Sequence, residues 1–500
     1  MRVTNQMINH GALKNIQHSQ TRVGDTTTQL TTGKIIQKAS DDPVIAMRAL
    51  KLRTTVSQLQ QYKDKNIKDA NSWMDVTETS LNNIVKRLTD VYDYCVQGAN
   101  DTYDSAARAS IIDSLQSLKN MIYSEGSATY AGRYIFTGYR TGTDLAFSTQ
   151  ESVDGVSYDI NEHLNSDDFY LKKTVTNPMQ KDQIDAYLAD PTAYEAPRDS
   201  QAYTIKLAYD DLEDTNVSVT FDGKTAAEAG FTFVTKDASQ VASYYDVADD
   251  EIAYIPETGE LVFGENAYIA LQSTKDIAVS YTKSTFEVGD LRPDHYFDCI
   301  KHEPQTDGTI KDIEFTQPEK GQEIQYEVNF NQYLTVNTQG KDAITHDMGN
   351  AIDELSNALK ELNDIEALIS ELNQKLADPT YNQNEDNVKM LNQLLADADV
   401  EMALKRDNVT KLFEKGETKF TNFMADVAAL QSDVGTRMDK LDMISVRVDE
   451  QYANFKELRS ANEDIESEEA IINWNEAQVT YNASLAATSN ILQTTLLDYL

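Results

Sequence analysis

The most regular feature of this chain is a stripe of apolar residues near its C-terminal end. From Phe420 onward, apolar residues recur at alternating steps of three and four, interrupted only by Arg437, Gln451 and Asn462. Such spacing keeps one narrow face of a helix against a partner helix, as in the seam of a coiled coil. At about 1.5 Å per residue, this helix would be roughly 70 Å long. The stripe consists of Phe420, Phe423, Val427, Leu430, Val434, Leu441, Ile444, Val448, Phe455, Leu458 and Ile465.

Three further segments repeat this spacing, so we predict helical rods at both ends of the chain. No proline occurs between residues 44 and 177, and nothing there forces a helix to break. The third stripe stops at Asp378 and Pro379, and a fourth follows it. The stripes run through Ile67, Ala70, Met74, Leu81, Ile84, Leu88, Val91 and Cys95, then through Ile352, Leu355, Leu359, Leu362, Ile369 and Leu372, and then through Val388, Leu391, Leu395, Ala398, Met402, Val409 and Leu412. The seam residues singled out are Leu81, Leu88, Phe423 and Leu441.

The middle of the chain follows a different pattern. Seven of the nine prolines lie between Pro178 and Pro318. Apolar and polar residues there alternate at every second position, which is typical of β-strands. Residues 254–263 predict two strands around a turn with glycine at its end. Further strands are predicted within residues 217–221, 277–281 and 324–328.

Together these patterns predict an α+β protein with three parts. The fold class is a long coaxial α-helical coiled-coil bundle, formed by the N- and C-terminal regions, with an inserted β-rich central domain. Residues 1–45 and 470–500 form the expected terminal helical assembly domain, residues 46–145 and 346–469 the helical rod domain, and residues 146–345 the β-rich insertion.

The outermost segments have weaker apolar repeats than the rods. Apolar residues recur there at intervals of seven, but the positions between them hold Gln20, Thr27, Thr488 and Thr495. Helices with so little apolar surface to bury are marginal when isolated. We therefore expect these ends to become ordered when they pack against other copies of the chain. The expected interaction residues are Ile16, Val23, Leu30, Val479, Leu485, Leu492 and Leu496.

Charge favours pairing of the two ends. Residues 1–70 hold 11 Lys or Arg against 5 Asp or Glu, whereas residues 461–500 hold 7 acidic residues and no basic one. Exposed ion pairs contribute roughly 0 to 1 kcal/mol each, and ordinary solvated helix faces could carry the same charges. The complementary apolar repeats make pairing the preferred interpretation. The formal net charge of the whole chain is −38, which argues against a nucleic-acid partner because phosphates would be repelled.

Signals of catalysis, metal binding and membrane insertion are weak. The six histidines form no pair at the helical spacing of a metal site, and neither a P-loop nor a His-Glu-x-x-His motif occurs. His295 and His302 lie near acidic residues and Cys299, but segments of this composition are usually just solvated. Two cysteines exclude a disulfide framework. From the missing motifs we expect no enzyme activity, cofactor or metal. No apolar run long enough for a secretory signal or a membrane span is present, so we expect no membrane partner either.

Two short motifs predict breaks in the helices. Asp42 precedes Pro43, an order in which the carboxylate caps free backbone N–H groups and proline takes the first helical position. The segment from Gly132 to Gly138 predicts a turn, a short aromatic strand and a second turn. This second motif would end the N-terminal rod and begin the insertion.

These motifs closely resemble those of the bacterial flagellin superfamily. Within it, the aromatic segment between two glycines and the Asp-Asp-Pro triplet are most similar to the hook-associated proteins that join hook and filament. The resemblance covers roughly residues 1–145 and 345–500 and leaves out the insertion. The segments that carry it are Thr32-Gly33-Lys34, Ser40-Asp41-Asp42-Pro43, Gly132-Arg133-Tyr134-Ile135-Phe136-Thr137-Gly138-Tyr139 and Leu496-Leu497-Asp498-Tyr499-Leu500.

The resemblance implies a non-enzymatic structural subunit of the bacterial flagellum, at the junction between hook and filament. The implied partners are other copies of the chain in a ring, the preceding hook-associated junction protein, filament flagellin, and an export chaperone at the C-terminal segment. The implied location is extracellular, reached through the flagellar type III export apparatus. Two alternatives stay open: filament flagellin itself, and a flagellar adhesin or glycan-binding module carried by the insertion.

Overall fold

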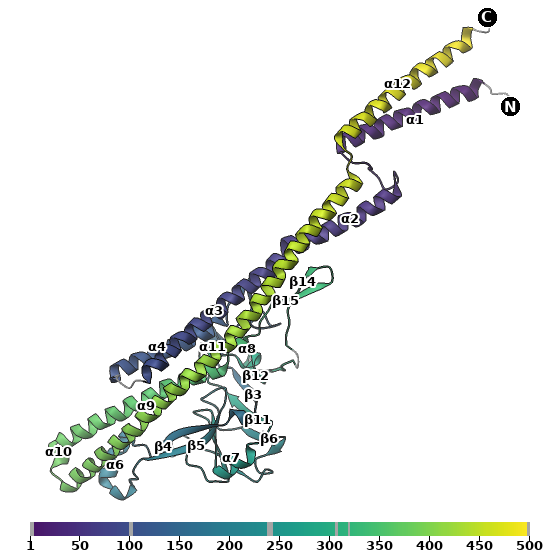
Figure 1. Cartoon of the computed structure of the whole chain (residues 1–500). Helices are drawn as coiled ribbons and strands as arrows, with labels where there is room; N and C mark the ends of the chain where they lie inside the picture. Colours follow the sequence, from purple (N-terminus) through teal and green to yellow (C-terminus); the bar gives the residue numbers. More distant parts are fainter. Residues whose placement is uncertain (1–4, 100–103, 238–243, 306–308, 319–320, 498–500) are drawn as a thin grey trace. The chain divides into compact units, whose positions relative to one another are not determined.

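The chain divides into two compact units, and their helices and strands are labelled in Figure 1. The structure is a computed structural model that describes residues 5–99, 104–237, 244–305, 309–318 and 321–497. Unit 1 comprises residues 1–71, 326–334 and 439–500, and unit 2 comprises residues 72–325 and 335–438. Long helices and a β-rich part occur together, so the predicted mixture of helices and sheets is confirmed.

Unit 1 is built mainly from helices. The helix α1 (Asn5–Thr32) lies along α12 (Ser467–Leu497). The two run antiparallel, because Thr27 contacts Trp474 while the earlier Ser19 contacts the later Ser484. The helix α2 (Pro43–Gln61) continues through a π-helical turn at Tyr62–Asn66 into α3 (Ile67–Gly98). The end of α11 (Glu385–Glu463) completes the helical part of the unit.

A small hairpin packs on the π-helical turn of unit 1. It consists of β14 (Gln325–Asn329) and β15 (Gln332–Thr335). The hydroxyl of Tyr62 donates to Glu327 Oε1 at 2.9 Å, and Asn66 Nδ2 donates to the Glu327 carbonyl at 2.7 Å. The strand predicted within residues 324–328 is therefore confirmed, although it joins neither of the two large sheets.

The helices of unit 2 approach one another closely where glycine permits it. They are α3 from Ser72 onward, α4 (Ser105–Glu125), α9 (His346–Ala377), α10 (Pro379–Asn382) and α11 as far as Met438. A Cβ atom on Gly98 of α3 would lie 2.6 Å from the ring of Phe413, and one on Gly416 of α11 would lie 2.9 Å from Cys95 Sγ. Real Cβ atoms do not approach neighbours so closely, so both positions require glycine for the observed packing.

Unit 2 also contains two large sheets that share one hydrophobic core. The six-stranded sheet has the order β13-β12-β3-β11-β6-β7, and the five-stranded sheet has the order β4-β5-β10-β9-β8. Neighbouring strands are antiparallel, except that β8 and β9 are parallel. Tyr158 and Tyr281 of the first sheet are buried together with Tyr254 and Phe263 of the second.

The strands predicted from alternation are confirmed, with Gly259 at a φ of +58° in the turn between β9 and β10. The strands of the large sheets are β3 (Ser157–Leu164), β4 (Tyr170–Thr176), β5 (Arg198–Lys206), β6 (Ser218–Phe221), β7 (Lys224–Thr225), β8 (Thr232–Thr235), β9 (Glu251–Ile255), β10 (Glu260–Phe263), β11 (Ile277–Lys283), β12 (Asp298–Pro304) and β13 (Ile310–Phe315). The remaining short elements are β1 (Thr129–Tyr130), β2 (Arg133–Tyr134), α5 (Gln150–Val153), α6 (Ile184–Ala189), α7 (Glu265–Leu271) and α8 (Gly340–Ala343).

Both short sequence motifs adopt their predicted local structures. The Asp42 side chain accepts hydrogen bonds from the backbone N–H groups of Val44 and Ile45, and the proline after it opens α2. The strands β1 and β2 form a hairpin whose turn contains Gly132 at a φ of +76°, and Gly138 follows at +59°. Left-handed backbone of this kind favours glycine, so these positions mark the two predicted turns.

Candidate assembly surface

The loop between α1 and α2 is joined to the break between α11 and α12. The backbone N–H of Ile35 donates to the carbonyl of Glu463 at 2.8 Å, and that of Ile465 donates to the carbonyl of Gly33 at 3.0 Å. Gly33 has a φ of +67°, a conformation open to glycine at little cost. The two helix breaks therefore lie side by side and are held by a short antiparallel bridge.

Four charged side chains, which we call the clasp, close this bridge. The guanidinium of Arg53 donates to both carboxylate oxygens of Glu463, each at 2.7 Å, and the Glu463 side chain is only 4% exposed. Lys34 pairs with Asp464 and, at 3.5 Å, with Glu463. Two parallel charge-assisted bonds are stronger and more directional than one. The hydrogen bond from Arg53 lowers the pKa of Glu463, so the pair stays charged at neutral pH.

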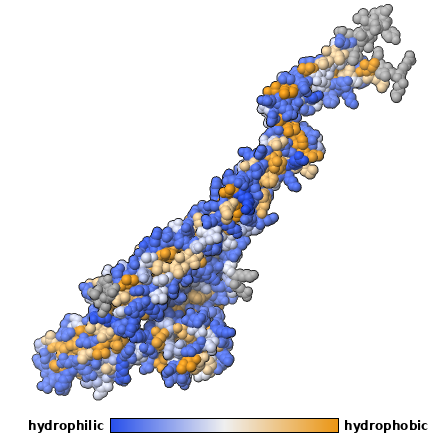
Figure 2. Space-filling model, viewed as in Figure 1, coloured by the Kyte–Doolittle hydropathy of each residue, from blue (hydrophilic) through white to orange (hydrophobic). Residues whose placement is uncertain are grey.

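The buried positions between α1 and α12 hold small side chains, and several large apolar side chains of the pair are exposed. The buried positions on the two helices are Ala12, Thr26, Ala470, Ala477 and Thr488. Figure 2 shows apolar patches on the visible surface of this helix pair. The exposed large apolar residues are Met7, Ile8, Leu13, Ile471, Ile472, Val479 and Leu485. Apolar burial contributes about 25 cal/mol per Å², so these exposed side chains add little to the stability of the pair and leave apolar surface to which a partner could bind.

The expected interaction residues fall into three groups in the structure. Ile16, Val23 and Leu30 are half-buried on α1. Val479 is 67% exposed and Leu485 is 40% exposed. The side chains of Leu492 and Leu496 lie outside the part of the chain that the structure describes. The helix pair therefore brings the α1 residues partly inside, whereas Val479 and Leu485 face outward.

The expected seam residues of the rods are more deeply placed. Leu81, Leu88 and Leu441 are fully buried, and Phe423 is half-buried. Along α11 every seventh residue is inaccessible or nearly so: Phe413, Phe420, Val427, Val434, Leu441 and Val448.

Two surface features were not singled out from the sequence. The first is the clasp, whose members are separated by some four hundred residues and show no local pattern. The second is an exposed apolar stripe on α2, formed by Val44, Met47 and Leu50, which are 63%, 67% and 63% exposed. These three residues recur at every third position, which could have indicated the stripe, but the same spacing is found in ordinary amphipathic helices.

The histidine and cysteine residues considered as possible metal ligands are held in ordinary hydrogen bonds or buried in the core. His302 contacts Asp312 at 2.7 Å and Asp159 at 3.0 Å. Within the described ranges, no cluster of three or more His, Cys, Asp or Glu is arranged to hold a metal ion. Cys95 and Cys299 are buried and free, and burial raises the pKa of each thiol to about 12. Among the described helices, none is both long and apolar enough to cross a membrane.

The N-terminal part of the chain matches a known family. Residues 3–141 match the model for the bacterial flagellin N-terminal helical region. The chain is 29% identical to flagellar hook-associated protein 3 of Escherichia coli strain K12 over 144 residues, which is 29% of this chain and 45% of that protein. The match to flagellar hook-associated protein 3 of Salmonella typhimurium strain LT2 is also 29% identical, over 142 residues, 28% of this chain and 44% of that protein. The chain thus matches somewhat under half the length of these relatives, and the resemblance predicted from the motifs is confirmed for its N-terminal part.

Solved structures of hook-associated proteins are also similar to this chain, at low scores. A putative flagellar hook-associated protein from Vibrio parahaemolyticus is 12% identical, covers 85% of this chain and 100% of that one, and has a TM-score of 0.36. The flagellar junction protein FlgL from Legionella pneumophila is 12% identical, covers 80% and 99%, and has a TM-score of 0.29. These TM-scores are too low to establish a shared fold, so the sequence match of the N-terminal helices carries the comparison.

Proposed function

We propose that this chain is a structural, non-enzymatic subunit of the bacterial flagellum, located outside the cell at the junction between hook and filament. The observation that carries the proposal is the match of residues 3–141, which spans α1 to α4 and includes both motifs, to the flagellin N-terminal region and to two hook-associated proteins 3. The outward-facing apolar residues of α1 and α12 support it, because a polymer subunit needs apolar surface left over for its neighbours.

A deletion strain tests this function. Cells without the gene should build hooks, lack filaments and release monomeric flagellin into the medium, because flagellin would have no junction to add to. Expression of the full chain from a plasmid should restore filaments. A deletion strain that still grows normal filaments would contradict the junction role.

Filament flagellin is the alternative within the same superfamily, and the match to a flagellin family model supports it equally. Quantitative mass spectrometry of purified flagella separates the two functions. A junction protein would be a trace component beside an abundant flagellin. If this chain made up most of the filament mass, it would be the flagellin.

The proposed partners follow from the same assignment. They are other copies of the chain in a ring, the preceding hook-associated junction protein, filament flagellin, and a chaperone that holds the C-terminal segment before type III export. The exposed Ile472, Val479 and Leu485 of α12 support the chaperone proposal, because an apolar helix face suits recognition in a groove. Removal of residues 471–500 should abolish chaperone binding in a pull-down and leave unit 2 folded. Undiminished binding would rule out this segment.

We also propose that the rod helices form a coiled-coil bundle and that the terminal, rod and β-rich parts act as separate domains. The burial of every seventh residue from Phe413 to Val448 supports the coiled coil, since a seam with that repeat is its hallmark. The coaxial arrangement of the helices stays a prediction. Small-angle X-ray scattering of the monomer would test the extended form.

The adhesin alternative has one supporting observation in unit 2. A hollow of about 280 Å³ lies between β4 and α11 and is lined by Tyr244, Tyr245, Lys173, Lys405 and Asn408 among others. Tyrosine rings and polar side chains together can bind a sugar. A glycan array probed with the full chain, with Tyr244→Ala as the comparison, tests this function. An array without a specific signal would remove it.

A further inference from the structure

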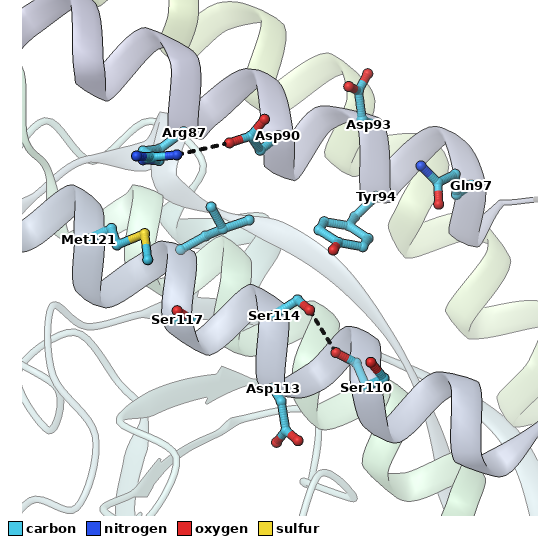
Figure 3. A pocket seen from close by; sticks show the side chains of 11 residues that line it. Arg87, Asp90, Asp93, Tyr94, Gln97, Ser110, Asp113, Ser114, Ser117 and Met121 are labelled. Carbon is cyan, nitrogen blue, oxygen red and sulfur yellow. Dashed lines mark hydrogen bonds and ion pairs between the residues drawn. The ribbon is translucent and has the colours of Figure 1, made fainter.

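A groove runs between α3 and α4 in unit 2 (Figure 3). It has a volume of about 610 Å³ and is open to solvent along its length. One wall consists of Arg87, Asp90, Tyr94 and Gln97 of α3, and the other consists of Ser110, Ser114, Ser117 and Met121 of α4. Residues on each wall are spaced by alternating steps of three and four, so each wall is a straight ridge on its helix. A third helix fits between two such ridges by placing its own ridge in the groove.

The groove is acidic and has little side-chain bulk on one wall. Arg87 contacts Asp90 at 3.4 Å, which leaves Asp93 and Asp113 as further negative charges at the rim. Both carboxylates are exposed, and neither forms an ion pair with the described part of the chain. The serines of α4 would let another helix approach closely, as small residues do. Met121, 44% exposed, and the Tyr94 ring, which points between the helices in Figure 3, offer apolar contact.

The outer face of α2 has the complementary character. Met47 lies three residues after Val44, Lys51 follows four residues later, and Leu50 lies beside them. Arg48 and Lys51 flank the apolar stripe, are exposed, and have no ion pair within the described residues. The helix α2 contains no acidic residue at all. From Val44 to Lys51 the stripe is roughly 10 Å long, so it covers about two thirds of the α3 wall, which is roughly 15 Å long from Arg87 to Gln97.

We propose that α2 of one copy of the chain docks into the groove between α3 and α4 of a second copy. The apolar stripe of Val44, Met47 and Leu50 would cover Tyr94 and Met121, and Arg48 and Lys51 would face Asp93 and Asp113. The proposal rests on the self-assembly in the proposed function and adds the two surfaces that meet.

The occupant has to come from another copy. The backbone is helical without interruption from Pro43 to Gly98, so α2 cannot turn back onto the later part of its own helical run. The opposite face of α2 is already occupied, since Arg53 binds Glu463 and Asn462 donates to the Ile45 carbonyl at 3.2 Å. Two different surfaces meeting head to tail generate a ring or an open helix and not a closed symmetric pair. A subunit between two helical polymers needs such an interface.

Disulfide cross-linking between full-length chains tests which surfaces meet. One chain carries Met47→Cys and a second, tagged chain carries Ser117→Cys, while the native Cys95 and Cys299 are buried and do not compete. Under mild oxidation at high protein concentration, the mixed dimer should form in clear excess over either homodimer. As a control, the second chain carries Asp399→Cys in place of Ser117→Cys. Asp399 is exposed on α11, outside the groove, so this pair should give only background cross-linking. A mixed dimer no more abundant than this background overturns the proposal.

Charge reversal measured by sedimentation tests the same contact without new cysteines. Asp113→Lys should weaken self-association about five-fold, as loss of about 1 kcal/mol would, whereas Asp399→Lys should have no such effect. Adding Lys51→Asp to Asp113→Lys should restore association, because every copy would then present both reversed charges. Failure of this rescue, or a chain that stays monomeric at every concentration, overturns the docking. The deletion strain reports separately on the junction role, so either result can fail without the other.

Discussion

The two units differ in how many of their large apolar side chains they leave exposed. Unit 2 buries its largest ones, including Trp73, Tyr158, Phe413 and Phe420, each at 1% exposure or less. Unit 1 buries mainly alanines where α1 meets α12 and exposes most of the large apolar residues that the described chain leaves at the surface, although it is the smaller unit. Burial of large side chains is the main source of folding free energy. Unit 2 is therefore equipped to fold as a monomer, whereas the α1 and α12 pair of unit 1 has little burial of its own to stabilise it, although Leu59, Leu441 and Val448 elsewhere in unit 1 are buried.

The largest expected effect comes from cutting a large side chain out of the core of unit 2. Phe420 is fully buried, so Phe420→Ala should lower the free energy of unfolding by about 3–5 kcal/mol through lost burial and the cavity left behind. Urea unfolding followed by circular dichroism measures this loss. The control is Leu458→Ala in unit 1, where the side chain is 54% exposed and the expected loss is under about 0.5 kcal/mol. If both variants lost the same free energy of unfolding, the deeper burial of side chains in unit 2 would not make it the more stable unit.

A second effect in unit 2 depends on pH. Glu162 of β3 is only 5% exposed and accepts hydrogen bonds from the Ala208 N–H at 3.1 Å and the Tyr281 hydroxyl at 2.7 Å. Removal from water raises the pKa of this carboxyl to about 7, whereas the pKa of an exposed glutamate is about 4.3. As the pH rises between these values, the unfolded chain releases the proton and the folded chain retains it. The free energy of unfolding therefore falls across this window and levels off above it.

The substitution Glu162→Gln should remove that dependence. The amide keeps an acceptor oxygen for both hydrogen bonds but carries no charge to desolvate. At pH 8 the variant should be more stable than the unaltered chain by up to about 3 kcal/mol, and near pH 4 the two should be alike. Urea unfolding at both pH values gives the difference, and Glu314→Gln on the exposed face of β13 is the control. A constant offset at both pH values would show that the carboxyl does not titrate in this window.

The clasp should have a smaller effect, confined to unit 1. Arg53→Ala leaves the buried carboxylate of Glu463 with only Lys34, and we expect a local loss of about 1 kcal/mol, since the Arg53 side chain is itself 56% exposed. Hydrogen exchange should become faster in α1 and α12, while exchange in the sheets of unit 2 stays unchanged. Lys51→Ala, on the same helix but without an ion pair in the described residues, should change neither. Faster exchange in both units would mean that the clasp stabilises the whole chain.

Local patterns predicted the elements, and long-range contacts could not be read from them. The repeat of three and four residues identified α3 and α11, and period-two alternation identified β6 and β11. Thr77 of α3 interrupts the apolar stripe from Ile67 to Cys95 because it is polar, yet it is fully buried, with its hydroxyl donating to the Trp73 carbonyl at 2.9 Å. The pairing of β3 with β11 joins residues more than a hundred positions apart, and alternation does not specify a partner strand.

The candidate surfaces were harder to predict for a related reason. Arg53 and Glu463 lie on helices from opposite ends of the chain, and a single sequence gives no signal that links two such charges. The walls of the α3 and α4 groove are mostly polar, so each helix taken alone reads as a solvated face. Only the placement of two such faces beside each other produces a groove.

The smallest effect on stability is expected at Val479, and it separates folding from assembly. Val479 is 67% exposed on α12, whereas Ala477, two residues earlier, is only 1% exposed against α1. Val479→Ser should leave the melting temperature of the monomer within error, because a side chain already in water loses little burial. It should nevertheless reduce self-association measured by sedimentation, because the apolar surface offered to a neighbour is smaller. The matched change Ala477→Leu should separate α1 from α12 by overpacking and speed hydrogen exchange in both helices. If Val479→Ser lowered the melting temperature and left association unchanged, the exposed apolar residues of α12 would serve folding. The larger exposed apolar surface of unit 1 would then not indicate an assembly role.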